Sequence, residues 1–258
     1  MIASSLTWRT GDDTREAEHA ATRSLAYEVT GAGPPLILLH GLSGSGRWWS
    51  KNVPAFAQNF RTYTVDLPGF GESRRVRWSR LDDTADRIAN WLADKELPPA
   101  HIAGHSLGGA VAARVATRHP DRIDRLVLVD AAIRPRGTRA TARPVRGPRT
   151  IRRVAQGFAP LVVRDLFRSH PRSFIRATVD ALQTDWESLT RINAPTLVVW
   201  GARDALTPLA LGHEIAAVVS GARLITLAEA GHNPMWECAD AFNVEVLLFL
   251  ADGDDTSE

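Results

Sequence analysis

Continuous apolar runs recur along the chain at wide spacing, and they predict the strands of a buried sheet. The runs are rich in β-branched and aliphatic residues and are continuous rather than alternating, which is typical of parallel strands covered on both faces. The runs cover residues 34–40, 60–66, 99–106, 123–130, 194–200 and 222–228. Two short segments near the start, SLTWRT at 5–10 and SLAYEVTG at 24–31, predict strands at an antiparallel edge.

Between these runs, hydrophobic positions recur at helical spacing. The predicted helices cover residues 80–96, 107–120, 208–221 and 239–251. Strands that alternate with helices predict an α/β fold, with a mostly parallel twisted sheet and helices on both of its faces. Residues 133–190 break this alternation with helix-like material, and we interpret them as a helical, arginine-rich lid inserted between two core segments, 1–132 and 191–258.

Composition adds few constraints. The chain has 258 residues, of which 44% are hydrophobic and 23% charged, and its formal net charge is only +2. The single cysteine, Cys238, excludes an intrachain disulfide. The charged N-terminal region does not resemble a signal peptide, and the apolar runs are far shorter than a membrane span. These features predict a cytoplasmic protein without membrane contact.

The stretch GHSLG, residues 104–108, places a serine between two glycines where a predicted strand passes into a predicted helix. A serine in such a tight turn projects its hydroxyl group above the sheet, and flanking glycines avoid clashes that a Cβ would cause. Ser106 is therefore the candidate nucleophile.

A serine hydroxyl becomes a strong nucleophile only when a base takes its proton and a third group orients that base. Asp204 and His232 each follow a predicted strand downstream of Ser106, in the order serine, acid, histidine that this turn requires. Asp130 also ends a predicted strand and is the alternative acid. The oxyanion of a tetrahedral intermediate needs amide donors, and the candidates are the backbone N–H groups of Leu42 and Leu107.

Five motifs together resemble the α/β-hydrolase superfamily, in particular its serine esterase, perhydrolase and carbon–carbon-bond hydrolase branch. They are LILLHGLSGSGRWW, VDLPGFGES, IAGHSLGGAVA, LVVWGARDALTP and AGHNPMWE. The resemblance extends from about residue 25 to residue 250 and weakens between residues 133 and 190. It implies the α/β-hydrolase fold, Ser106 as nucleophile, Asp204 as acid, His232 as base, and Leu42 and Leu107 as oxyanion donors.

Several aromatic residues are candidates for the lining of an apolar substrate pocket. These are Trp48, Trp49, Trp236 and Phe158, together with His40, which the resemblance assigns to the shaping of the oxyanion loop. The alternative for each is ordinary packing. No metal-binding motif is present, so the sequence predicts neither a metal nor a cofactor.

Positive charge is concentrated in the predicted lid. Residues 134–176 contain twelve arginines and one acid, Asp165. Ile151, Val154, Phe158, Val162 and Phe167 follow near-helical spacing and predict an amphipathic segment with its apolar side over the pocket. Three interpretations remain open: a solvated face, recognition of an anionic substrate, or contact with anionic lipid. No nucleic-acid-binding module is recognised.

The sequence therefore predicts a serine hydrolase that cleaves a carboxylic ester or thioester through an acyl-enzyme. Its expected partner is a small-molecule ester or thioester, with an anionic or carrier-bound acyl group as one alternative. Two other functions remain open. The same triad serves carbon–carbon bond hydrolysis or a biosynthetic acyltransfer, lyase or cyclisation step, and a non-catalytic, receptor-like module would retain only the pocket.

Overall fold

The computed structural model describes residues 24–134, 158–182 and 186–252. In this part of the chain one seven-stranded sheet has the order β1-β3-β2-β4-β5-β6-β7. Its strands are β1 (Tyr27–Thr30), β2 (Pro35–Leu39), β3 (Arg61–Val65), β4 (Ala100–His105), β5 (Ile123–Val129), β6 (Thr196–Gly201) and β7 (Arg223–Leu227). Only β1 pairs antiparallel, with β3. All six predicted parallel strands are confirmed.

The predicted antiparallel edge is confirmed for residues 24–31, which contain β1. The other predicted edge segment, residues 5–10, lies outside the described residues. The central strands β2, β4 and β6 are buried along their whole length, and this explains why their sequences are continuous apolar runs rather than alternating ones.

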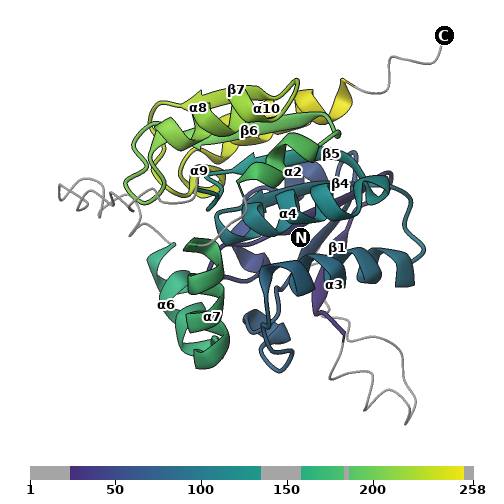
Figure 1. Cartoon of the computed structure of the whole chain (residues 1–258), viewed down its shortest axis with the longest axis vertical. Coiled ribbons are helices and arrows are strands. Elements are labelled where there is room, and N and C mark those ends of the chain that lie inside the picture. The colour runs from purple at the N-terminus through teal and green to yellow at the C-terminus, as the bar shows by residue number, and fades with distance from the viewer. Residues whose placement is uncertain (1–23, 135–157, 183–185, 253–258) are drawn as a thin grey trace, which may run out of the picture.

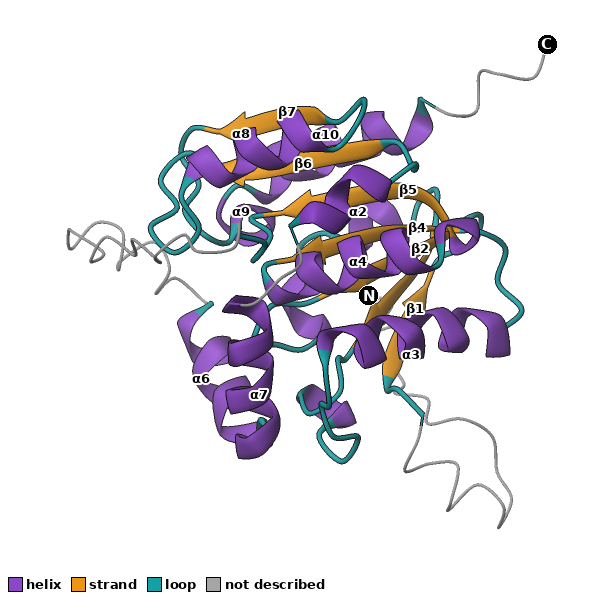
Figure 2. Cartoon of the chain, in the orientation of Figure 1, coloured by secondary structure: helices purple, strands orange, loops and turns teal. Residues whose placement is uncertain are grey.

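Helices cover both faces of the sheet (Figure 2). The longer ones are α3 (Leu81–Asp94), α4 (Leu107–Arg118), α8 (Leu209–Val218) and α10 (Ala239–Ala251), and the short ones are α2 (Val53–Phe56) and α9 (Pro234–Glu237). Residues of α3, α4 and α8 share one apolar cluster with the sheet, and residues of α2 and α10 share the other. The α/β class and the two-faced helical cover are therefore confirmed. Every described helix is too short or too polar to traverse a bilayer.

Two further helices, α6 (Ala159–Arg168) and α7 (Pro171–Leu182), come between β5 and β6 in the chain. Figure 1 shows them in green at one side of the sheet, where α7 contacts α3 and α4. They belong to the segment that the sequence predicts to be a lid. Most of the predicted lid's arginines, together with Ile151 and Val154, fall in residues 135–157, outside the described residues.

The apolar stripe predicted for this segment is wrong in one position. Phe158 is buried, but Phe167 is 85% exposed. Five residues separate Phe167 from Val162, which turns an α-helix by about 500° and places the two on different sides. The inner face of α6 instead contains a charged residue, Asp165, which is 1% exposed.

Candidate active site

Ser106 lies in the turn between β4 and α4, where the backbone is strained. Its φ and ψ are 51° and −113°, a combination that residues with a Cβ rarely adopt. A Cβ on Gly104 would lie 2.2 Å from the carbonyl oxygen of Gly108, and a Cβ on Gly108 would lie 2.4 Å from that of Leu39. The turn is therefore packed so closely that both flanking positions require glycine, as the sequence indicates.

The three side chains that the sequence singles out form one hydrogen-bonded chain. The Oγ of Ser106 is 3.1 Å from Nε2 of His232, and Nδ1 of the same imidazole is 2.7 Å from Oδ2 of Asp204. Because a carboxylate only accepts, Nδ1 carries the proton and donates it to Asp204. Nε2 is then left with a lone pair that faces the serine hydroxyl.

Asp204 is held as an anion by the loop that follows β6. Burial raises the pKa of this carboxyl group, but hydrogen bonds from His232 and Thr207 outweigh burial and leave the pKa lowered. Oδ1 accepts the N–H groups of Leu206 and Thr207 at 2.7 and 3.0 Å, and Oδ2 accepts the hydroxyl of Thr207. The acid therefore stays ionised beside the imidazole.

The loops after β6 and β7 approach each other through glycine. A Cβ on Gly201 would lie 1.9 Å from the carbonyl oxygen of Gly231, so these two chains meet only because Gly201 has no side chain. Glu237, on α9, then accepts the N–H groups of Gly231 and Asn233 at 2.9 and 3.1 Å. These contacts hold the residues on both sides of His232.

A second histidine supports the first. His105 is fully buried, and its Nε2 is 2.7 Å from the backbone carbonyl oxygen of His232. Burial, followed by the nearby His232, lowers the pKa of His105 to about 3, so the ring is neutral and Nε2 donates. His105 thus fixes the backbone of His232.

The alternative acid, Asp130, lies at the end of β5 but is not the partner of the imidazole. Its Oδ1 accepts the N–H of Gly201 at 3.0 Å, whereas Nδ1 of His232 is hydrogen-bonded to Asp204. The structure therefore brings Asp204 into the chain of hydrogen bonds and leaves Asp130 beside it.

The loop that follows β2, residues 41–49, carries the predicted oxyanion donor Leu42. Neither this amide nor that of Leu107 donates a hydrogen bond to another described residue. Leu107 begins α4, where first-turn N–H groups have no partner within the helix. Both amides are therefore free to bind an anion.

Two buried carboxyl groups hold this loop. Asp66 accepts the N–H of Gly46 at 2.7 Å, and Asp165, on α6, accepts the hydroxyl of Ser45 at 2.7 Å and the indole N–H of Trp48 at 3.1 Å. Burial raises the pKa of Asp66 to about 6 despite its backbone hydrogen bonds, and the charge of Asp165 adds to this effect. The loop is therefore tied both to the core and to α6.

The predicted pocket residues separate into two groups. Trp48, Phe158 and Trp236 form an aromatic row, with ring centroids 5.0 and 4.9 Å apart, and Trp48 also lies 5.9 Å from His105. Trp49 is fully buried 6.1 Å from Phe242 in the core.

His40 is also fully buried. Its Nδ1 contacts the carbonyl of Gly41 at 2.7 Å, its Nε2 accepts the N–H of Leu67 at 2.9 Å, and burial lowers its pKa to about 4. Both Trp49 and His40 are enclosed by core and loop atoms, and their assignment to the pocket lining stays a prediction.

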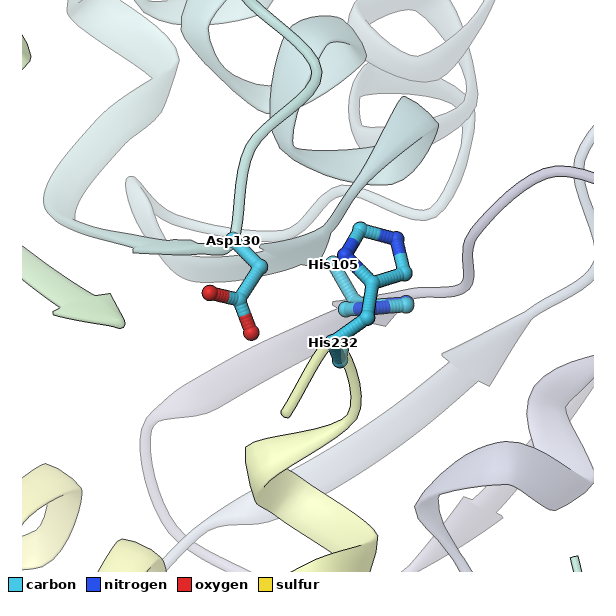
Figure 3. A group of neighbouring side chains, drawn as sticks. All are labelled: His105, Asp130 and His232. Atoms are coloured by element: carbon cyan, nitrogen blue, oxygen red, sulfur yellow. The ribbon is translucent and has the colours of Figure 1, made fainter. Parts of the chain in front are cut away.

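A cluster of metal-ligating residue types lies in the same region. Figure 3 shows the carboxyl group of Asp130 near the imidazole rings of His105 and His232, and one ligand atom of each lies within 4.8 Å of the others. Sequence spacing does not predict this cluster, because its members come from three separate strand ends. Hydrogen bonds to Ser106, Asp204, Gly201 and the His232 carbonyl already engage these side chains.

Comparison with known proteins identifies the family. A sequence model of the alpha/beta hydrolase family matches residues 36–245, so the chain belongs to that family. A hydrolase from Pseudomonas aeruginosa PA01 has a similar structure, with a TM-score of 0.79 and 28% identity, over 97% of this chain and 100% of that one.

Curated relatives include esterases and carbon–carbon-bond hydrolases. A pimeloyl-[acyl-carrier protein] methyl ester esterase of Chromobacterium violaceum is 32% identical, over 82% of this chain and 92% of the relative. A 2-hydroxy-6-oxononadienedioate/2-hydroxy-6-oxononatrienedioate hydrolase of Burkholderia vietnamiensis is 30% identical, over 87% and 90%. The chain spans only 65% of a third relative, the dihydrolipoyllysine-residue acetyltransferase component of an acetoin cleaving system from Pseudomonas putida.

Sequence reasoning misses the residues that hold the site rather than form it. It assigns no contact to His105, and it counts Asp165 only as the single acid among arginines. Glu237 has the one local signal. It lies four residues after Asn233, the N-cap of α9, which is one residue more than the spacing of a capping box. The contacts of His105 and Asp165 join segments more than 100 residues apart, and no local pattern indicates them.

Proposed function

We propose that the protein is a serine hydrolase that cleaves a carboxylic ester or thioester through an acyl-enzyme. The observation that carries this proposal is the continuous chain from the Ser106 hydroxyl through His232 to Asp204, at 3.1 and 2.7 Å. His232 removes the serine proton as Oγ attacks the carbonyl carbon, and Asp204 stabilises the resulting imidazolium. The same imidazole then protonates the leaving alcohol or thiol.

We assign the stabilisation of the negative charge that develops on the carbonyl oxygen to the N–H groups of Leu42 and Leu107. Their lack of other described partners supports this role. Water, activated by His232, then attacks the acyl-enzyme and releases the acid. We assign the aromatic row of Trp48, Phe158 and Trp236 to the apolar part of the substrate, and α6 and α7 to a lid beside the site.

The experiment that tests this proposal is labelling with a fluorophosphonate probe. We expect one equivalent to bind the wild-type protein and none to bind Ser106→Ala, with both proteins equally folded by circular dichroism. The matched control is Ser79→Ala, which changes an exposed serine whose hydroxyl is hydrogen-bonded to the neighbouring Asp83, and it should label like the wild type. A folded wild-type protein that takes up no probe would favour the non-catalytic, receptor-like alternative.

A second candidate function is carbon–carbon bond hydrolysis by the same three residues. The resemblance to the Burkholderia vietnamiensis hydrolase supports this alternative, and acyltransfer would use the same acyl-enzyme with an alcohol in place of water. Turnover of a panel of p-nitrophenyl esters, compared with that of a vinylogous diketone substrate, distinguishes the two. Ester turnover that exceeds diketone turnover supports the ester proposal, and the reverse result contradicts it.

We also propose that the substrate carries an anionic or carrier-bound acyl group. Arg164, Arg172 and Arg176 are exposed on α6 and α7, and exposed arginines pair well with carboxylates and phosphates. Salt screens such contacts, so KM for a dicarboxylate monoester should rise with ionic strength while KM for a neutral ester stays constant. Equal salt dependence for both substrates would contradict this proposal and favour a solvated face.

A further inference from the structure

Asp130 is a buried carboxyl group that the proposed reaction does not use. It is fully buried at the end of β5, and its backbone has a φ of 41°, which is unusual for a residue with a side chain. Its N–H donates to the carbonyl of Val199, and its Oδ1 accepts from Gly201. Oδ2 is buried without a hydrogen-bond partner among the described residues.

The groups around this carboxyl are acidic or neutral. Asp204, on the loop after β6, and Glu237 both act on it as negative charges, and the effect of Asp204 is the larger. His105 and His232 each offer a ring nitrogen within 4.8 Å. The largest charge effects on the pKa of Asp130 come from the acids Asp204 and Glu237.

Two adjacent buried carboxyl groups do not both ionise, because their charges repel where water cannot screen them. Asp204 accepts hydrogen bonds on both oxygens and is the better-supported anion. Asp130 has one donor for two oxygens, and burial, followed by the charge of Asp204, raises its pKa well above the usual value. A protonated Oδ2 becomes a donor, and the Asp204 carboxylate is the acceptor beside it.

We propose that Asp130 is a positioning residue of this site, which donates a hydrogen bond to Asp204 through a protonated carboxyl group and replaces Asp204 as the counter-ion of His232 when Asp204 is neutralised. The inference rests on the proposed function, since it assigns a supporting role within the same site. Its consequence is a pair of acids that share one proton. The second acid keeps Asp204 ionised as the imidazolium forms, because a hydrogen bond to a carboxylate favours the charged state.

Substitutions by asparagine test whether the carboxyl group of Asp130 carries a proton. In Asp130→Asn the amide still accepts from Gly201 and still donates to Asp204, so we expect kcat within about threefold of wild type, the size of one modest hydrogen-bond change. Loss of the ionised acid in Asp204→Asn should lower kcat far more, by up to about 10⁴-fold. Asp124→Asn, an exposed acid on the same strand, is the matched control and should leave kcat unchanged.

The double variant tests the replacement of one acid by the other. With Asp204 neutralised, Asp130 is the remaining acid beside His232, so Asp204→Asn/Asp130→Asn should be about tenfold or more slower than Asp204→Asn alone, the factor that corresponds to one pKa unit of the base. The acid limb of the kcat/KM pH profile should also shift in the double variant and not in Asp130→Asn. If Asp130 had a purely structural role, neither this ratio of rates nor this shift of the acid limb would be observed.

An infrared band from a protonated carboxyl group, present in the wild type and absent from Asp130→Asn, tests the proton independently of turnover. Three results would each overturn the inference. They are equal kcat values for Asp204→Asn and the double variant, a loss of kcat in Asp130→Asn as large as that in Asp204→Asn, and the absence of this band. If the wild type neither labels nor turns over, the proposed function fails, and the infrared comparison still decides the protonation of Asp130.

Discussion

Asp165 gives the sharpest test of how the inserted helices act on the site. Truncation in Asp165→Ala removes the acceptor for the Ser45 hydroxyl and the Trp48 indole N–H, both of which are buried. Each buried donor left without a partner costs about 1–3 kcal/mol. Removal of a buried carboxyl whose Oδ1 has no partner among the described residues recovers part of that cost. We therefore expect a net loss of about 2–4 kcal/mol in the free energy of unfolding.

Asp165→Asn keeps an oxygen where Oδ2 lies and should cost about 1 kcal/mol. For a chain of this size, about 1 kcal/mol shifts Tm by about 2–4 °C, so thermal unfolding separates the two variants. Arg164→Ala, at an exposed position on the same helix, is the control and should change stability by less than about 0.5 kcal/mol.

Activity distinguishes a local role from a general loss of stability. The loop held by Asp165 carries Leu42, so Asp165→Ala should lower kcat for a p-nitrophenyl ester well below its unfolding temperature, while Asp165→Asn retains most of it. Equal Tm values for the alanine and asparagine variants would refute the hydrogen-bond reasoning. A kcat unchanged in Asp165→Ala would refute the link between α6 and the oxyanion loop.

Three further predictions test the packing and electrostatics of the site. Gly108→Ala should abolish probe labelling and destabilise the fold by at least about 1–3 kcal/mol, because its Cβ would lie 2.4 Å from a backbone oxygen; a labelled, stable variant would contradict the packing of the turn. Phe158→Ala should lower the free energy of unfolding in urea by about 3–5 kcal/mol, whereas Phe167→Ala should change it by less than about 0.5 kcal/mol. Similar values would contradict the burial of Phe158 and the exposure of Phe167. Burial lowers the pKa of His105 from 6.5 to about 3, so the stability it contributes is complete above pH 6.5 and is lost as the pH falls towards 3. Between about pH 7 and about pH 5 the free energy of unfolding of the wild type should fall by about 2 kcal/mol more than that of His105→Gln. If the two free energies fall in parallel with pH, His105 is not held neutral.

The sheet and the three triad positions could be predicted because each depends on a short local pattern. A strand buried on both faces needs a continuous apolar run, and the turn at Ser106 needs glycines at fixed spacing. The order of serine, acid and histidine then limits the remaining choices to Asp204 or Asp130 for the acid. Only the geometry decides between these two, because both follow a buried strand in the sequence.

Which residue of α6 faces inward could not be predicted, because the buried position holds an acidic residue, Asp165. Asp165 satisfies donors on a loop more than 100 residues earlier in the chain, and hydrophobic periodicity contains no information about such a contact. The spacing instead suggests Phe167, which continues the series of apolar residues but not the helical face. A buried acid at the expected apolar position indicates that α6 is specified by its polar contacts with the site as well as by packing.

The non-glycine residues with strained backbones in the described chain are concentrated near Ser106, Asp204 and His232. Ser43, Ser106 and Asp130 are three of the four described non-glycine residues with positive φ, and they follow β2, β4 and β5. Two buried atoms without partners among the described residues, Nδ1 of His105 and Oδ2 of Asp130, lie in the same region. Each such feature costs stability, and none is needed to close the sheet. Their concentration at one edge is expected if this edge is shaped by a reaction, because strain at a functional site persists only where the surrounding structure enforces it.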